Sequence, residues 1–233
     1  MKLSRILGWI DRELDVASFD DVSNNGLQIA RSGEEVRKVA FAVDGSAKSV
    51  RAASAAGAQL LVVHHGISWG GGIKRLTDGA YAVVKAAMDA NIALAAYHLP
   101  LDANRKYGNN WEIARRLSLT GVKQAFPYHG NVIGVIGRAP KGRRTEDREL
   151  GLSIAPGSLV GVCSGGAGEF AVEAKSLGCD IYVTGEASWG DVVAAENVGM
   201  DLVCAGHYKT ETFGVRALSR GLSKSLHVET VFV

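Results

Sequence analysis

The sequence predicts an α/β fold made of two α/β domains, each with a mostly parallel sheet covered by helices. Hydrophobic residues make up 47% of the 233 residues, which is enough to build a sizeable core. Short β-branched apolar runs alternate with alanine-rich amphipathic runs, as in parallel sheets. Several of the apolar runs end in His, Asp or Glu, at the strand ends where such sheets bind ligands.

The first half of the chain contains the clearer alternation. The opening run "MKLSRILGWIDREL" predicts an amphipathic helix, because its apolar part is too short for a signal peptide. Strands are then expected at 36–44, 59–65 and 92–98, and helices at 46–58, 77–91 and 109–119. Thr77 or Asp78 is the candidate N-cap of the middle helix. The alternation weakens over 122–130, so a domain boundary is expected near residue 125.

The pattern restarts at residue 131. Strands are expected at 131–139, 158–163, 180–186, 201–207 and 227–233, and helices at 171–179, 188–199 and 210–226. Residues 1–125 therefore form the first domain, which 205–233 are expected to complete, and 126–204 form the second. The polar connector 140–150 is interpreted as a solvent-exposed loop, with phosphate binding by its arginines as the alternative.

Charge and composition narrow the classes of partner. The net charge of +2 provides no general basic field of the kind that nucleic-acid-binding proteins carry. No apolar run approaches the ~20 residues of a membrane span. The three cysteines are widely spaced and are interpreted as small buried hydrophobes in a reducing compartment. We therefore expect a cytoplasmic protein without a membrane partner, and nucleic acid is a disfavoured partner.

The strand ends carry the residues that could perform chemistry. They are Asp44, His64, His65, His98, Asp102, Glu186 and His207. Imidazole and carboxylate are the expected ligands of Zn, Fe, Mn or Ni. Glu211 follows His207 by four residues; with a helix beginning near Thr210, Glu211 lies in its first turn and His207 on the preceding loop. Both side chains could then reach one ion.

The adjacent histidines, His64 and His65, favour a pair of ions. Consecutive strand side chains point to opposite faces, so two neighbours chelate a single ion poorly. At the frayed end of a strand they can serve two ions about 3.5–4 Å apart. A carboxylate is suited to bridge such a pair because it has two oxygens. The sequence therefore predicts a two-metal site at the carboxyl ends of the strands.

Two further features leave alternatives open. Asp44 is interpreted equally as the N-cap of the following helix and as a catalytic residue. The segment "VCSGGAG" (162–168) favours a strand-to-helix turn, with anion binding at a helix N-terminus as the alternative. Nucleophilic catalysis by serine or cysteine has little support, because no G-x-S-x-G motif and no Cys–His pairing stands out.

Seven motifs resemble, in this order, those of the NGG-interacting-factor-three-like family, whose bacterial members are often named GTP cyclohydrolase I type 2 homologues. The resemblance extends from Asn24 to Leu218. The motifs are "NNGLQ" (24–28), "VVHHGISW" (62–69), "YHLPLDAN" (97–104), "GNN" (108–110), "CSGGAG" (163–168), "YVTGE" (182–186) and "AGHYKTETFGVRAL" (205–218).

The resemblance implies a dinuclear metal centre between the two domains and a homo-hexameric ring. The residues that match the family's ligands are His64, His65, Asp102, His207 and Glu211, with Glu211 bridging the ions. His64 and His207 would belong to one ion, and His65 and Asp102 to the other. His98 resembles a near neighbour of the ions. The metal could be Zn, Fe, Mn or Ni, and two divalent ions per chain are expected.

The favoured function is that of a metal-dependent hydrolase resembling GTP cyclohydrolase type 2, acting on a nucleotide or related small molecule. A water that bridges the two ions would be the nucleophile, and His98 or Glu186 would carry a proton. Two alternatives remain open. One is a metal storage or delivery protein without enzymatic activity. The other, less favoured, is a ring that binds nucleic acid.

Overall fold

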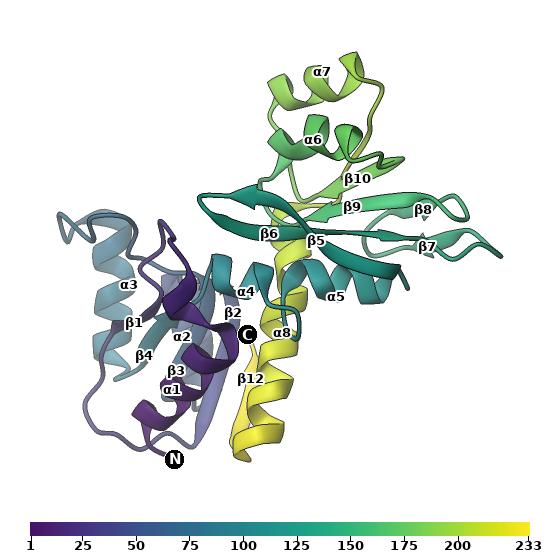
Figure 1. Ribbon diagram of the computed structural model, residues 1–233. Helices are drawn as coiled ribbons and strands as arrows, with labels where there is room; N and C mark the ends of the chain where they lie inside the picture. Colours follow the sequence, from purple (N-terminus) through teal and green to yellow (C-terminus); the bar gives the residue numbers. More distant parts are fainter. The chain divides into compact units, whose positions relative to one another are not determined.

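The computed structural model describes all 233 residues and divides into two compact units (Figure 1). The first unit comprises 1–101 and 215–233, and the second comprises 102–214. The chain passes from one unit to the other within helices α4 (Leu99–Ala103) and α8 (His207–Leu226). These limits differ from the domain ranges expected from the sequence, because the helix over 109–116 packs into the core of the second unit.

The first unit contains a five-stranded sheet with the order β1-β4-β3-β2-β12. Strands β2 (Lys38–Asp44), β3 (Leu60–His65), β4 (Ala93–Ala96) and β12 (Glu229–Phe232) are parallel, and β1 (Gly26–Ile29) is antiparallel to β4. The central strands are apolar almost throughout, as expected for a sheet buried on both faces. Their parallel direction brings the ends of β2 and β3 to one edge.

Helices cover both faces of this sheet. Helices α2 (Ala47–Ala55) and α3 (Asp78–Asp89) pack small residues, including Ala53 and Ala87, against one face. Helix α1 (Leu3–Leu14) buries Ile6 and Ile10 and lies in front of the sheet in Figure 1. Ser46 caps α2 through a capping box with Ser49, so the helix begins directly after the end of β2.

The second unit contains a mixed five-stranded sheet with the order β11-β10-β9-β6-β5. Strands β9 (Leu159–Cys163), β10 (Ile181–Thr184) and β11 (Asp201–Cys204) are parallel. Strands β5 (Thr120–Tyr128) and β6 (Asn131–Arg138) form an antiparallel hairpin beside β9. A small separate ladder joins β7 (Thr145–Asp147) to β8 (Leu152–Ile154).

The second sheet is also covered on both faces. Helix α5 (Asn109–Arg116) packs Trp111 and Ile113 against one face. Helices α6 (Ala171–Ser176) and α7 (Trp189–Asn197) lie on the other face, above β9 and β10 in Figure 1. Two short 3₁₀ helices, η1 (Val16–Ser18) and η2 (Gly168–Phe170), complete the elements.

The α/β class and the helix-covered sheets that the sequence predicts are confirmed. Three local differences have physical reasons. Most of the region over 122–130, where the alternation weakens, belongs to the edge strand β5, and its mixed polarity reflects that exposed position. The connector 140–150 contains β7, and its Asp147 is buried in an ion pair with Arg116. Helix α8 begins at His207, three residues before the expected Thr210.

Candidate metal-binding residues

In the first unit, the end of β3 places two imidazoles side by side. His64 is fully buried and His65 is half-buried, and their ring centroids lie 4.6 Å apart. The His98 ring, just after β4, lies 5.1 Å from His64 and 5.8 Å from His65. One ligand atom from each of the three residues falls within 4.8 Å of the others, a spacing that a single ion can span.

This convergence corrects the expectation that the two adjacent histidines point to opposite faces. Strand alternation applies within a regular strand, and β3 ends at His65. The chain leaves the strand at Gly66, directly after His65. Nitrogen atoms of both rings therefore lie close enough together to bind a common ion in the first unit.

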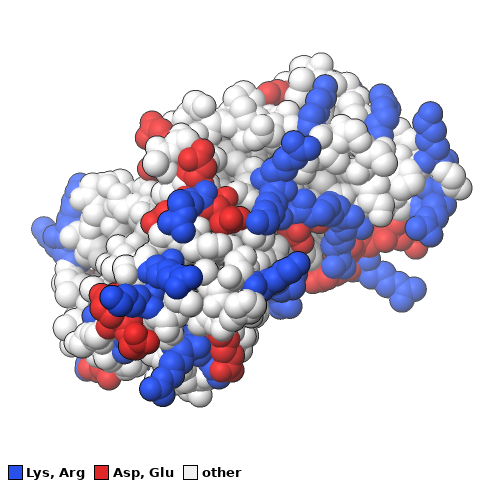
Figure 2. All heavy atoms as spheres, turned by 60° about the horizontal axis from the view of Figure 1, so that its bottom comes forward, with Lys and Arg blue, Asp and Glu red and all other residues white.

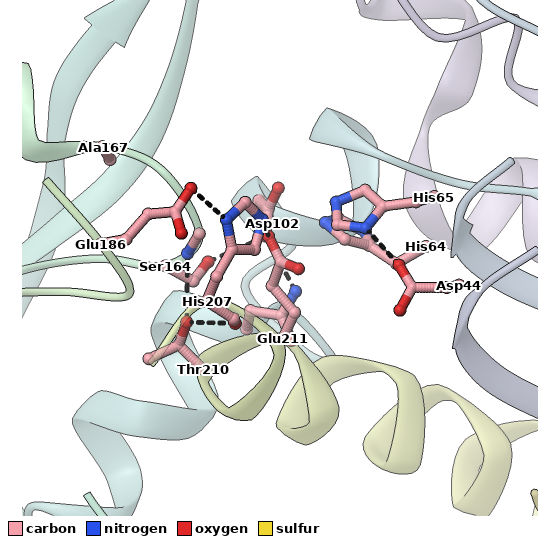
Figure 3. Close-up of polar contacts among 12 residues, drawn as sticks. Asp44, His64, His65, Asp102, Ser164, Ala167, Glu186, His207, Thr210 and Glu211 are labelled. Carbon is pink, nitrogen blue, oxygen red and sulfur yellow. Dashed lines mark hydrogen bonds and ion pairs between the residues drawn. The ribbon is translucent and has the colours of Figure 1, made fainter. Parts of the chain in front are cut away.

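Each of these three histidines uses Nδ1 as a hydrogen-bond donor. His64 Nδ1 lies 2.9 Å from the Tyr97 carbonyl oxygen, and His65 Nδ1 lies 2.9 Å from Asp44 Oδ1 (Figure 3). His98 Nδ1 lies 2.9 Å from Asp21 Oδ1. A carbonyl or carboxylate oxygen only accepts, so Nδ1 carries the hydrogen and the lone pair of the neutral ring is on Nε2. In their neutral form, all three rings therefore present the tautomer that can bind a metal through Nε2.

The loop before β1 fixes His98. Asp21 Oδ2 accepts the Leu99 backbone N–H at 2.9 Å, and Asn25 Oδ1 accepts the His98 backbone N–H at 2.8 Å. Burial alone would raise the pKa of Asp21, but the His98 hydrogen bond and charge outweigh it and lower the pKa to about 2. Asp21 is therefore an anion in the folded protein, and it holds the His98 ring by two routes.

The glycine after the histidines is required by close packing. A Cβ at Gly66 would overlap the Gln28 amide and lie 2.5 Å from the Ala96 Cβ. Gln28 Oε1 accepts the backbone N–H groups of Ile67 and Ser68 at 2.7 and 3.0 Å. The side chain of Gln28, from the "NNGLQ" motif, thus anchors the loop that follows β3.

This loop also brings an indole beside the histidines. Trp69 Nε1 donates to the Gly66 carbonyl at 2.9 Å. Its ring lies edge-on to His98 with centroids 5.1 Å apart, and 37% of the residue is exposed. Trp69 was not among the residues expected at the site. An aromatic residue four positions after a paired histidine was the available signal.

In the second unit, Asp102 is held in a buried polar network. Its Oδ1 accepts from Asn109 Nδ2 at 2.8 Å and from Ser164 Oγ at 3.0 Å (Figure 3). Asp102 is 6% exposed and both of its donors are buried. Hydrogen bonds to the ionised form favour the carboxylate, so these donors stabilise the charge that a metal ligand needs.

The role of the motif "GNN" lies in this network. Asn110 Nδ2 donates to the Ile133 carbonyl at 2.7 Å, and Asn110 Oδ1 accepts the Ser164 backbone N–H at 2.6 Å. Asn109 Oδ1 accepts the backbone N–H of Gly214 in α8 at 2.7 Å. The two amides therefore connect α5, the end of β9 and α8 around Asp102. This positioning role was not predicted from the motif itself.

At the other end of this network, α8 presents His207 and Glu211 on one face. Because the helix begins at His207, the two residues lie one turn apart, and His207 is not on a preceding loop. His207 Nε2 lies 3.1 Å from Glu211 Oε1, and His207 Nδ1 lies 3.0 Å from Glu186 Oε1. Glu211 is buried and Glu186 is exposed.

The two carboxylates change the protonation of His207. The hydrogen bond from His207 to Glu211 is the largest influence, burial opposes it, and Glu186 adds to it, so the pKa of His207 rises to about 9. At neutral pH the ring is an imidazolium between two anions. A divalent cation is a natural replacement for that proton, because it meets the same carboxylate charge.

The turn "SGG" packs directly on this pair. Gly165 has a φ of 69°, and a Cβ there would overlap Glu211 Oε1 and lie 3.4 Å from His207 Nε2. Its backbone N–H donates to Thr210 Oγ1 at 3.1 Å. The segment is thus a turn that leaves room beside Glu211 and places Ser164 on Asp102. The segment therefore positions the carboxylates Glu211 and Asp102, a role that was not predicted from the sequence.

The interpretation of Asp44 as the N-cap of α2 is wrong. The N-cap of α2 is Ser46, and Asp44 accepts from His65. Asp44 and His65 are neighbours in the register of β2 and β3, which explains the contact. Thr77 occupies the N-cap position of α3 without a side-chain capping bond.

A family model described as Duf34/NIF3 (NGG1p interacting factor 3) matches residues 1–233. Relatives named "GTP cyclohydrolase 1 type 2 homolog" match across nearly the whole chain. The one from Archaeoglobus fulgidus is 36% identical, covering 100% of this chain and 98% of its own length. The one from Deinococcus radiodurans is 37% identical, covering 98% of this chain and 91% of its own length.

Solved structures share the fold over the full length. "Protein ybgI, unknown function" superposes with a TM-score of 0.86 at 28% identity, covering 100% of this chain and 98% of that chain. TTHA1606 from Thermus thermophilus has a TM-score of 0.83 at 29% identity, covering 100% and 97%. Within the chain, no helix is both long enough and apolar enough to span a membrane.

Proposed function

The chain belongs to the Duf34/NIF3 family, and from this membership and its ligand sets we propose that it binds two divalent metal ions and hydrolyses a nucleotide or related small molecule. The proposed ligands are His64, His65, Asp102, His207 and Glu211. The names of the curated relatives support a reaction of the GTP cyclohydrolase type 2 kind.

The observation that carries the proposal is the shared state of the histidines in the first unit. Metal-binding histidines characteristically donate their second ring N–H to a carboxylate or a backbone carbonyl, which fixes the tautomer and raises ligand basicity. His64, His65 and His98 all have this arrangement, with Tyr97, Asp44 and Asp21 as acceptors. A histidine that serves only packing does not need an oriented Nε2.

The second unit supports the proposal through charge. Glu211 and Asp102 are carboxylates in buried surroundings. Buried carboxylates are costly unless a cation or hydrogen bonds compensate them. Asp102 has two hydrogen-bond donors, and Glu211 has the His207 imidazolium. A divalent ion would add the compensation that this set of oxygen and nitrogen donors suits.

Divalent ions, when bound, lower the pKa of coordinated water and polarise substrate oxygens. The chain's own groups would move protons. His98 is oriented by the Asp21 carboxylate, and Glu186 is exposed to solvent while it contacts His207. Trp69 offers a partly exposed flat surface beside His98, suited to stacking a planar base. These features favour a nucleotide over an aliphatic substrate.

The test is turnover by protein reconstituted with Zn, Fe, Mn or Ni against a panel of nucleoside triphosphates and phosphoesters. The control is Glu211→Gln, which keeps the shape and removes the charge. We expect product formation with at least one substrate, at least ~100-fold faster than with Glu211→Gln. Trp69→Leu is expected to raise KM for purine substrates and to leave metal content unchanged.

Two results would overturn the proposal in different ways. Activity equal to that of Glu211→Gln on every substrate would remove the enzymatic part. If the same protein exchanged its metal rapidly with an acceptor apoprotein, the storage or delivery function would take its place. A chain that bound no divalent metal would contradict both.

A further inference from the structure

The second unit contains a hollow of about 380 Å³ that the proposed function does not use. Its polar lining residues are Thr120, Lys123 and Arg138, and its apolar lining residues are Ile136, Leu159 and Leu177. The volume lies within the ~300–1,000 Å³ range typical of pockets for small molecules. The hollow is built on the hairpin of β5 and β6, with β9 beside it.

A β-bulge creates the lining. Thr120 pairs with Arg138 and Lys123 pairs with Ile136, so two residues of β5 oppose the single residue Gly137. Residues three apart in a regular strand point to opposite faces. The extra residue, with Gly121 at a φ of 61°, restores Thr120 and Lys123 to the same face. Both side chains therefore line the hollow only because the strand is bulged.

The register of the sheet places most of the lining residues of the hollow side by side. Arg138 lies between Thr120 of β5 and Leu159 of β9, so these three form one row across the sheet. Lys123 and Ile136 form the neighbouring row. Leu177, directly after α6, provides an apolar wall and is 43% exposed. The hollow thus combines cationic groups with an apolar surface.

The two cations of the hollow have no acidic partner. No ion pair involves Lys123 or Arg138, and the lining contains no carboxylate. Arg138 Nη1 donates to the Gly157 carbonyl at 3.1 Å, which steadies the guanidinium and leaves its other N–H groups available. Asp180 accepts the Leu159 backbone N–H at 2.8 Å and is not among the lining residues.

Two other arginines of this unit are in ion pairs with carboxylates. Arg116 contacts both Asp147 and Glu149, and Arg115 contacts Glu112. On the face drawn in Figure 2, acidic side chains lie beside only some of the lysines and arginines. Lys123 and Arg138 are both exposed, and two cations without acidic partners beside one partly apolar hollow attract an anion more strongly than a single such cation does.

We propose that this hollow binds a small organic anion. Its phosphate or carboxylate group pairs with Lys123 and Arg138, and its apolar body lies against Ile136, Leu159 and Leu177. Arg138 provides a planar fork suited to two oxygens, and Lys123 provides a point charge. The proposal is independent of the metal-binding function, since none of the proposed metal ligands lines the hollow.

The test is a titration of the full, ¹⁵N-labelled chain with phenyl phosphate, benzoate and inorganic phosphate, followed through the amide signals of Thr120 and Gly121. These site-resolved signals separate binding in the hollow from any binding of phosphate to metal. We expect saturable shifts with phenyl phosphate or benzoate. Lys123→Gln and Arg138→Gln should each weaken that binding by ~10-fold, the usual effect of losing one charge-assisted hydrogen bond.

Two further variants test whether binding depends on the lining of the hollow. Arg143→Gln removes an exposed cation outside the lining and should leave binding unchanged. Leu177→Gln should weaken both aromatic ligands and leave inorganic phosphate unaffected. Comparison of phenyl phosphate with benzoate identifies the preferred anionic group. The proposal is overturned if no probe shifts these amides at millimolar concentration, or if Lys123→Gln and Arg143→Gln bind alike.

Discussion

In the first unit, three imidazoles each donate Nδ1–H to a single oxygen, whereas in the second unit two carboxylates depend on groups from several elements. His64 and His65 follow directly from a buried parallel strand, and one acceptor orients each of them. Asp102 relies on Asn109 and Ser164, which α5 and the end of β9 provide. A neutral ligand requires orientation, and a buried anion requires compensation of its charge as well.

The largest expected effect is the loss of a charged ligand from the second unit. Glu211→Gln should lower divalent-metal affinity by more than ~100-fold, because the carboxylate is buried and touches His207. Titration calorimetry with Zn²⁺ or Mn²⁺ measures this change. Glu196→Gln, at an exposed position of α7, is the matched control. A loss below ~3-fold at Glu211 would remove this residue from the ligand set.

Disruption of the amide network should affect folding more than any change at a single acceptor in the first unit. Asn110→Ala removes a donor to Ile133 and an acceptor for Ser164, both in buried positions. The expected cost is about 2–3 kcal/mol of unfolding free energy, since buried partners are left unsatisfied. Urea denaturation measures it, with the exposed Asn197→Ala as control. Equal midpoints for the two variants would contradict the network's role.

Within the first unit, the two carboxylate acceptors should differ. Asp21→Asn should lower metal affinity by ~10–100-fold, the usual range for such supporting residues, because Asp21 is an anion with a pKa of about 2 beside His98. Asp44→Asn should have a smaller effect, because the Asp44 side chain is 54% exposed and water can replace it at His65. The same calorimetric titration applies. A larger loss of metal affinity in Asp44→Asn than in Asp21→Asn would show that burial does not determine how strongly these carboxylates support metal binding.

The protonation of His207 gives the second unit a pH dependence. In the metal-free protein the pKa of His207 is about 9, with Glu211 as its main cause. A metal can bind this ring only after its proton leaves, so affinity should rise by ~10-fold per pH unit up to about pH 9. The same proton also adds to the free energy of unfolding of the metal-free protein. This contribution is fully present below pH 6.5 and is lost as the pH rises through about 9.

Calorimetry in buffers of different ionisation enthalpy measures the protons released on metal binding at about pH 7.5. Glu186→Gln removes one of the two carboxylates on His207 and should move the affinity plateau to lower pH. Metal affinity that is constant between about pH 7 and pH 9 in the unsubstituted protein would contradict the pairing of His207 with Glu211.

The sequence predicted the features that depend on local patterns. Apolar runs that end in His64 and His65 gave the parallel strands and their edge, because burial and strand termination are encoded within a few residues. The α/β class followed from the same alternation. The predicted start of α8, at Thr210, was three residues too late. The sequence pattern did not indicate that His207 already belongs to the first turn of the helix.

The features that were missed depend on tertiary contacts. Asp21 reaches His98 across 77 residues of sequence, and Asn109 reaches Gly214 across 105. No local periodicity encodes such pairs. The convergence of the His64 and His65 rings was missed for a related reason: strand alternation describes regular strands, and His65 is the last residue of β3, directly before Gly66, which packs against Gln28.

The proposed function requires that both units provide metal ligands. Elemental analysis of protein purified without added metal, in parallel with His65→Ala and Glu211→Gln, measures this requirement without an assay of turnover. We predict about two equivalents of divalent metal per chain and a clear loss in both variants, one from each unit. A metal content that neither substitution changes, or protein that carries no metal before and after incubation with Zn²⁺, Fe²⁺, Mn²⁺ or Ni²⁺, would contradict it.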